Sequence, residues 1–220
     1  DQPLLNRSTQ ELYPPGSTFK VVTAAAALDS GEYTPDSIVS GESPKEIGGV
    51  PLSNCCAEGS GDYGPLSLTE GLTNSVNTVW AEVGEKLGRG TMLDYMEKFG
   101  FLSDPPLDYP HEQMVESGVV MKGGKLANED DGFDVGRVAI GQGGEEGQIR
   151  ATPLQMAQVA ATVANDGVLM EPTITQEVKD PDGRVSEELD PEEQSEVMST
   201  ESADQLAVMM TNVAEEGTAS

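Results

Sequence analysis

The chain has 220 residues, of which 36% are apolar, and its 12 Lys and Arg against 39 Asp and Glu give a formal net charge of −27. This length suits one domain with a real core, and the charge argues against a nucleic-acid partner because an acidic protein repels phosphates. An anionic membrane surface is disfavoured for the same reason, and solubility is the simplest interpretation of the acidity.

The cysteines, the single histidine and the hydropathy of the chain limit which disulfides, metal sites and membrane spans we expect. Cys55 and Cys56 are adjacent, so we expect free thiols or one intermolecular link rather than a disulfide framework. No metal site is expected, because His111 is the only histidine and no Cys-x-x-Cys pair occurs; His111 itself is expected at the surface. No window of about 18 apolar residues predicts a membrane span. The missing signal peptide fits a cytoplasmic protein or a piece of a longer one.

The first predicted helix runs from about residue 17 to residue 30. Pro14, Pro15 and Gly16 cannot lie inside a helix and hold the approach to it extended, and Gly31 ends it. Residues 21–28 are apolar nearly all round, so this helix is expected to be buried.

Four further helices are expected, at about residues 67–74, 78–87, 152–167 and 202–216. The first of them starts at a capping box, in which Ser67 precedes Glu70 by three residues, and the second stops at Gly88. The third begins with Thr152 as N-cap and Pro153 at the first helical position.

The segments between the helices are long. Residues 32–66 and 103–136 show no helical period, and we expect loops with short strands that carry function or shape a cleft. Residues 168–178, followed by Asp182-Gly183, predict a strand and a hairpin turn. Residues 186–201 are acidic and are expected to form a solvated surface.

The sharpest chemical motif is Ser-x-x-Lys, at Ser17 and Lys20. Residues three apart on a helix share a face, so the Lys20 amine can lie beside the Ser17 hydroxyl. A serine is a weak nucleophile until a neighbour takes its proton, and a lysine can do so only where burial lowers its pKa. The helix N-terminus adds N–H groups that would stabilise an oxyanion. Alone the motif is weak, because an N-capping serine before a solvated lysine has the same pattern.

A second motif, Ser75-Val76-Asn77, lies at the break between two predicted helices. There a short Ser-x-Asn can point both polar side chains into a cleft, although a turn with an N-capping serine would look the same. Together the two motifs, in this order and spacing, match the first two signatures of the penicillin-recognising serine enzymes.

The segment from Tyr13 to Lys20 (YPPGSTFK) closely resembles the active-site segment of high-molecular-weight penicillin-binding proteins. The similarity covers essentially residues 1–220 as one partial transpeptidase domain, and points to the monofunctional division or elongation type, of the actinobacterial kind. Other similar segments are Leu5-Asn6-Arg7, Gly141-Gln142-Gly143, residues 151–157 and residues 164–167.

The resemblance implies an α+β fold, namely the mainly helical part of the serine β-lactamase and D,D-peptidase fold, with much of the central sheet absent from this chain. It implies a D,D-transpeptidase that cross-links peptidoglycan stem peptides and is acylated by β-lactams. Ser17 would be the nucleophile and Lys20 its proton acceptor. Ser75 would relay a proton to the leaving D-alanine, and Asn77 would bind the substrate backbone.

Three glycine-loop residues, Gly141, Gln142 and Gly143, are candidates for substrate binding. The interpretation that we favour is a tight loop whose glycines permit close backbone packing near the cleft. The resemblance implies no cofactor. It implies as partners stem peptides, β-lactams, a glycosyltransferase and divisome or elongasome proteins, at an extracytoplasmic site with a membrane anchor outside this chain.

The chain departs from the family in two respects, one of which is that the sheet strands expected before the serine helix are absent from this sequence. It also has no Lys-Thr-Gly motif, and Lys122-Gly123-Gly124 stands in the wrong place and context. The chain alone is therefore expected to be poorly active or inactive. Two alternatives share the fold. One is a β-lactam sensor or silent cell-wall partner, and the other is a serine β-lactamase, although no deacylating Glu-x-x-x-Asn pattern follows the Ser-x-Asn motif. An acidic helical interaction module with accidental motifs is the remaining alternative.

Overall fold

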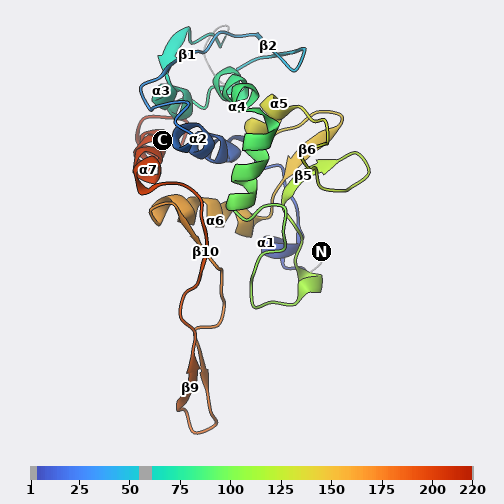
Figure 1. Ribbon diagram of the computed structural model, residues 1–220, viewed down its shortest axis with the longest axis vertical. Coiled ribbons are helices and arrows are strands. Elements are labelled where there is room, and N and C mark those ends of the chain that lie inside the picture. The colour runs from blue at the N-terminus through green and yellow to red at the C-terminus, as the bar shows by residue number, and fades with distance from the viewer. Residues whose placement is uncertain (1–3, 55–60, 220) are drawn as a thin grey trace.

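The computed structural model describes residues 4–54 and 61–219, and Cys55 and Cys56 lie outside them. The chain is α+β, with helices gathered in one body (Figure 1). In chain order the elements are α1 (Arg7–Gln10), the 3₁₀ helix η1 (Gly16–Phe19), α2 (Lys20–Asp29), β1 (Ile38–Ser40), β2 (Lys45–Ile47), β3 (Val50–Leu52), β4 (Pro65–Ser67), α3 (Leu68–Thr73), α4 (Asn77–Lys98), η2 (His111–Gln113), β5 (Gly118–Met121), α5 (Val135–Ala139), β6 (Gly147–Arg150), α6 (Pro153–Ala164), β7 (Val168–Met170), β8 (Glu177–Lys179), β9 (Val185–Glu188), β10 (Glu193–Glu196) and α7 (Thr200–Glu215).

Helix α2 lies at the centre of the body. Its residues from Val22 to Leu28 are buried, and it packs against α4, α5 and α7. The small side chains of residues 24–27 let these neighbours approach closely, while large side chains fill the surrounding space. Phe19 and Phe101, for example, meet edge to face with their ring centroids 5.7 Å apart. The prediction of a buried first helix is confirmed.

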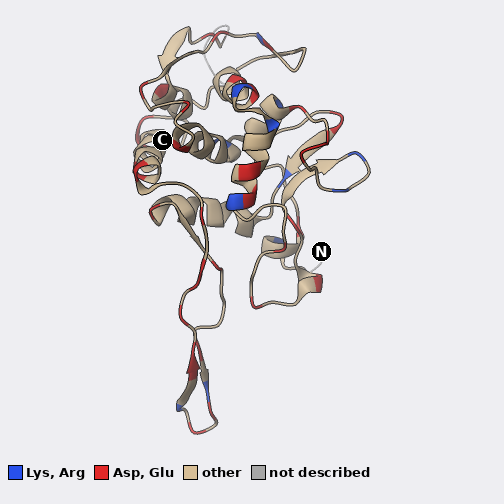
Figure 2. Ribbon diagram, viewed as in Figure 1, with Lys and Arg blue, Asp and Glu red and all other residues tan. Residues whose placement is uncertain are grey.

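The strands form small sheets only. Within the described residues every sheet has two antiparallel strands, in the pairs β1–β4, β2–β3, β5–β6, β7–β10 and β8–β9. The β8–β9 hairpin projects from the body as an arm (Figure 1), and Figure 2 shows acidic residues along it. No helix in the described segments is long and apolar enough to cross a bilayer.

Local capping signals placed the helix starts correctly. Ser67 and Glu70 form the predicted capping box at α3, and the Thr152 hydroxyl accepts from the N–H of Gln155 at α6. Gly88 does leave the helical conformation, with φ 79°, but the chain resumes the helix at once and α4 continues to Lys98. The prediction that Gly88 stops this helix is therefore confirmed, whereas the helical segment that follows the kink, up to Lys98, was not predicted.

Two predictions for the strands need correction. The expected strand over residues 168–178 is two separate strands, β7 and β8, because Pro172 cannot donate a ladder hydrogen bond between them. The acidic stretch at residues 186–201 is only partly solvated, since β10 pairs with β7 and Val197 and Met198 are buried. The hairpin turn at Asp182-Gly183 is confirmed, and the side chain of His111 is 82% exposed, as expected.

Asp29, at the end of α2, ties this helix to two others. Its carboxylate accepts from the Tyr95 hydroxyl of α4 at 2.7 Å and from the backbone N–H of Ser199, before α7, at 2.8 Å. Partial burial would raise the pKa of Asp29, but these hydrogen bonds outweigh it and hold the pKa below its ordinary value of 3.8.

A stability test follows from this contact. A folded-state pKa below the unfolded one contributes stability above pH 3.8, which is lost as the pH falls through the folded pKa. Asp29→Asn should lower the free energy of unfolding at pH 7 by about 1 kcal/mol, a modest value because solvent screens a partly exposed carboxylate. In urea titrations, the difference in free energy of unfolding between the wild type and Asp29→Asn should become smaller toward pH 3. Asp204→Asn, at an exposed position on α7, is the control, and an equal deficit at both pH values would contradict the assignment.

Candidate active site

The nucleophile candidate stands in the tight turn that precedes α2. Residues 16–19 form a 3₁₀ helix, in which side chains at i and i+3 eclipse, so Ser17 and Lys20 are aligned more closely than in an α-helix. The Lys20 Nζ lies 3.1 Å from the Ser17 Oγ. Ser17 is exposed whereas Lys20 is 0% exposed, so the hydroxyl faces solvent and the amine lies beneath it.

The second motif reaches the same amine from the turn between α3 and α4. Ser75 adopts φ 52°, a left-handed conformation that is uncommon for a residue with a side chain and that occurs often at functional sites. This turn brings Ser75 Oγ, Ser75 O and Asn77 Oδ1 each to 2.8 Å from Lys20 Nζ. The structure thus joins the four residues Ser17, Lys20, Ser75 and Asn77 in one network around a buried amine.

A cavity of about 410 Å³ opens beside the two serines. Ser17, Lys20 and Ser75 line one side of it, and α6, α7 and residues after α7 form the opposite side. Most of the other lining residues are apolar: Val21, Leu72, Met156, Val159, Ala160, Met210, Val213 and Ala219, with Thr18 and Thr218. Asn77 is largely buried, with 8% of its surface exposed, and its Oδ1 contacts the Lys20 amine next to these lining residues.

Comparison with known proteins decides the family. A family model described as penicillin binding protein transpeptidase domain matches residues 1–220. The chain belongs to the penicillin-binding protein transpeptidase family.

Relatives in the penicillin-binding protein family agree in sequence and in structure. The peptidoglycan D,D-transpeptidase PbpA of Mycolicibacterium smegmatis is 36% identical over 209 residues, which are 94% of this chain and 40% of that protein. Penicillin-binding protein A from M. tuberculosis, solved as an imipenem acyl-enzyme complex, has 30% identity and a TM-score of 0.81 over 97% of this chain and 46% of that one. The D,D-transpeptidase domain of a peptidoglycan glycosyltransferase from Eggerthella lenta has 28% identity and a TM-score of 0.83, over 99% of this chain and 52% of that one. The chain thus spans about two fifths of the PbpA length.

The glycine loop of this penicillin-binding domain supports η1 from behind. The N–H of Gly16 donates to the carbonyl of Gly141 at 3.0 Å, and Gly143 bridges to Gln148. Gln142 is exposed, and none of the three loop residues lines the cavity. This geometry supports the favoured interpretation, in which the glycines allow close backbone packing.

Sequence reasoning missed the apolar side of the cavity. Met156 and Val159 of α6 and Met210 and Val213 of α7 lie on helices that were predicted, but no motif marked these residues as part of a site. The missing information is which helices face each other, and apolar periodicity within one helix cannot supply it.

Proposed function

We propose that this chain is the acylating part of a D,D-transpeptidase that cross-links peptidoglycan stem peptides and that β-lactams acylate. The observation that carries the proposal is the position of Lys20 Nζ, 3.1 Å from Ser17 Oγ and 2.8 Å from Ser75 Oγ, below an exposed Ser17 at a cavity. A base within hydrogen-bond reach of a serine hydroxyl is what nucleophilic catalysis by serine requires.

The first half-reaction uses the three side chains in sequence. A bond forms between Ser17 Oγ and the carbonyl carbon of the penultimate D-alanine, while the peptide bond to the last D-alanine breaks. The Ser17 proton passes to Lys20 Nζ, and from there through Ser75 Oγ to the amine of the leaving D-alanine. Lys20 must begin uncharged, and complete burial favours that form. The backbone N–H of Ser17 is one donor to the oxyanion.

The second half-reaction completes the cross-link. An amine of a second stem attacks the ester carbon, the bond to Ser17 Oγ breaks, and the proton of the amine returns through Lys20 to Ser17. A β-lactam takes the place of the donor stem: its ring amide opens on Ser17 and leaves a covalent adduct. The Asn77 Oδ1 fixes the Lys20 amine from below, and we propose that the Asn77 amide also orients the substrate backbone.

The test is covalent labelling by fluorescent penicillin, with the protein expressed from its full reading frame. We expect one adduct, located on Ser17 by mass spectrometry of the peptide that spans residues 13–20, and no adduct in Ser17→Ala. Labelling that persists in Ser17→Ala would refute the proposal. A lasting adduct with cross-linking of supplied stems identifies the transpeptidase, a lasting adduct without cross-linking identifies a sensor, and rapid penicillin turnover identifies a β-lactamase.

We further propose that the protein acts outside the cytoplasmic membrane, on an anchor not included in this chain, beside a glycosyltransferase and proteins of the division or elongation machinery. The support is the family itself, because the relative from Eggerthella lenta is the D,D-transpeptidase domain of a peptidoglycan glycosyltransferase. The test is to purify the full-length protein from detergent-solubilised membranes. We expect a glycosyltransferase and proteins of the division or elongation machinery to co-purify with it. Recovery of the protein in the soluble cytoplasmic fraction would contradict this placement.

A further inference from the structure

Helix α4 begins without a capping side chain of its own. Its first residue is Asn77, and the residue before it, Val76, cannot accept a hydrogen bond through its side chain. Ser75, one residue before the N-cap position, directs its hydroxyl to Lys20 instead. The first N–H groups of α4, which have no partner within the helix, therefore need an acceptor from elsewhere.

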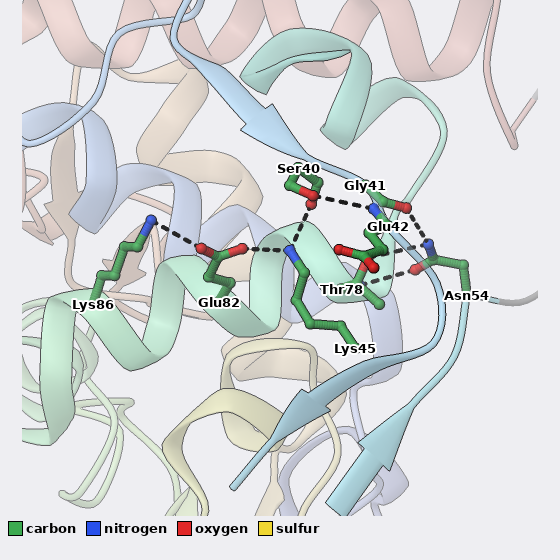
Figure 3. Close-up of polar contacts among 8 residues, drawn as sticks. All are labelled: Ser40, Gly41, Glu42, Lys45, Asn54, Thr78, Glu82 and Lys86. Carbon is green, nitrogen blue, oxygen red and sulfur yellow. Dashed lines mark hydrogen bonds and ion pairs between the residues drawn. The ribbon is translucent and has the colours of Figure 1, made fainter. Parts of the chain in front are cut away.

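Asn54, which follows β3, supplies that acceptor. Its Oδ1 accepts from the backbone N–H of Thr78 at 2.9 Å, and its Nδ2 donates to the Thr78 hydroxyl at 3.1 Å. Nδ2 also donates to the carbonyls of Gly61 at 2.9 Å and Gly41 at 3.2 Å, and carbonyls on that side fix which atom of the amide is nitrogen. One carboxamide thus holds the backbone N–H and the hydroxyl of Thr78, the residue that follows Asn77 (Figure 3).

The segment from Lys45 to Asn54, which contains β2 and β3, makes a second contact with α4, one helical turn after Thr78. Lys45 forms an ion pair with Glu82 of α4 and donates to the carbonyl of Ser40, and Lys86 contacts the other carboxylate oxygen of Glu82 (Figure 3). These contacts hold the pKa of Glu82 below its ordinary value despite partial burial, which by itself would raise it. Because this segment contacts α4 at two points, Thr78 and Glu82, its orientation relative to the helix is fixed as well as its position.

We propose that Asn54 is a positioning residue for the acylation machinery, acting through Thr78 on the turn that carries Ser75 and Asn77. This inference rests on the proposed function, since the groups that it positions are those around Lys20. Thr78 is 0% exposed and directly follows Asn77, so its backbone cannot shift without moving the oxygen that Asn77 offers to Lys20 at 2.8 Å. Displacement of the amine then changes its distance to Ser17.

The experiment compares Asn54→Ala with the wild-type protein, both expressed from the full reading frame. Stopped-flow labelling with fluorescent penicillin separates the non-covalent affinity from the acylation rate constant. We expect the rate constant to fall by about tenfold to a hundredfold, as misplacement of catalytic groups produces, with the affinity nearly unchanged. A purely structural role would lower the melting temperature and leave the rate constant of the folded protein unchanged.

Asn165→Ala is the matched control, because Asn165, which follows α6, also donates from its amide to a backbone carbonyl, that of Val168 at the start of β7. It should leave the acylation rate constant unchanged. Hydrogen exchange gives a readout independent of labelling: Asn54→Ala should speed exchange at the Thr78 amide, and Asn165→Ala should not. Wild-type acylation by Asn54→Ala, or unchanged exchange at Thr78, would overturn this inference alone, whereas labelling of Ser17→Ala would overturn the proposed function.

Discussion

Replacement of Lys20 by methionine should slow acylation of Ser17 by about 10²-fold to 10⁴-fold, the range that a positioned general base contributes. Methionine fills much the same volume in an apolar site but has no group that can take the Ser17 proton. It also leaves Ser75 Oγ without the amine that connects it to Ser17, so departure of the leaving group loses its proton donor as well. The measurement is the rate of fluorescent-penicillin labelling in the full-length protein.

Two further substitutions separate base chemistry from structural support. Lys20→Arg replaces the neutral amine with a permanent cation that cannot accept a proton at neutral pH, so it should be as slow as Lys20→Met. Lys86→Met removes an exposed lysine of α4 that pairs with Glu82 and should acylate at the wild-type rate. Melting temperatures establish that each variant is folded. A folded Lys20→Met protein that acylates within tenfold of the wild type would remove the chemical basis of the proposed function.

The parts of the structure that the sequence could predict are those that local chemistry determines. The serine and lysine are three residues apart, so any helical turn brings them together, and the capping box at Ser67 satisfies its own backbone. Even here the sequence did not distinguish a 3₁₀ first turn from an α-helical one. The 3₁₀ turn aligns Ser17 with Lys20, and no residue preference marks it.

The parts that could not be predicted depend on partners far along the chain. Strand β5 lies inside residues 103–136, where short strands were expected but could not be placed, because its partner is β6 and a short strand acquires its hydrogen bonds only from such a partner. Asn54 has no motif around it, yet it caps a helix that begins at Asn77. The left-handed conformation of Ser75 similarly depends on the two helices that meet there, and not on the preference of serine.

Substitution of Gly141 by alanine adds one methyl group and should strongly destabilise the fold at this site. On the present backbone the new Cβ would lie 1.8 Å from the carbonyl oxygen and 2.7 Å from the nitrogen of Gly16, both backbone atoms of η1. Gly141 also has φ +75°, which disfavours any side chain. The two effects together should destabilise the fold by about 3 kcal/mol or more.

Gly49→Ala separates the two effects, because Gly49 has the same φ of +75° but nothing within 4 Å of the position of a Cβ. Gly49→Ala should lower the free energy of unfolding by about 1–2 kcal/mol, which is the effect of the left-handed backbone conformation alone, and should leave the acylation rate unchanged. Gly141→Ala should cost more in urea titrations and, where the protein still folds, should slow labelling because Gly16 can yield only by moving Ser17 away from Lys20. Equal destabilisation by the two variants, with wild-type labelling in both, would show that η1 does not depend on the loop behind it. The nucleophile would then owe its position to α2 alone.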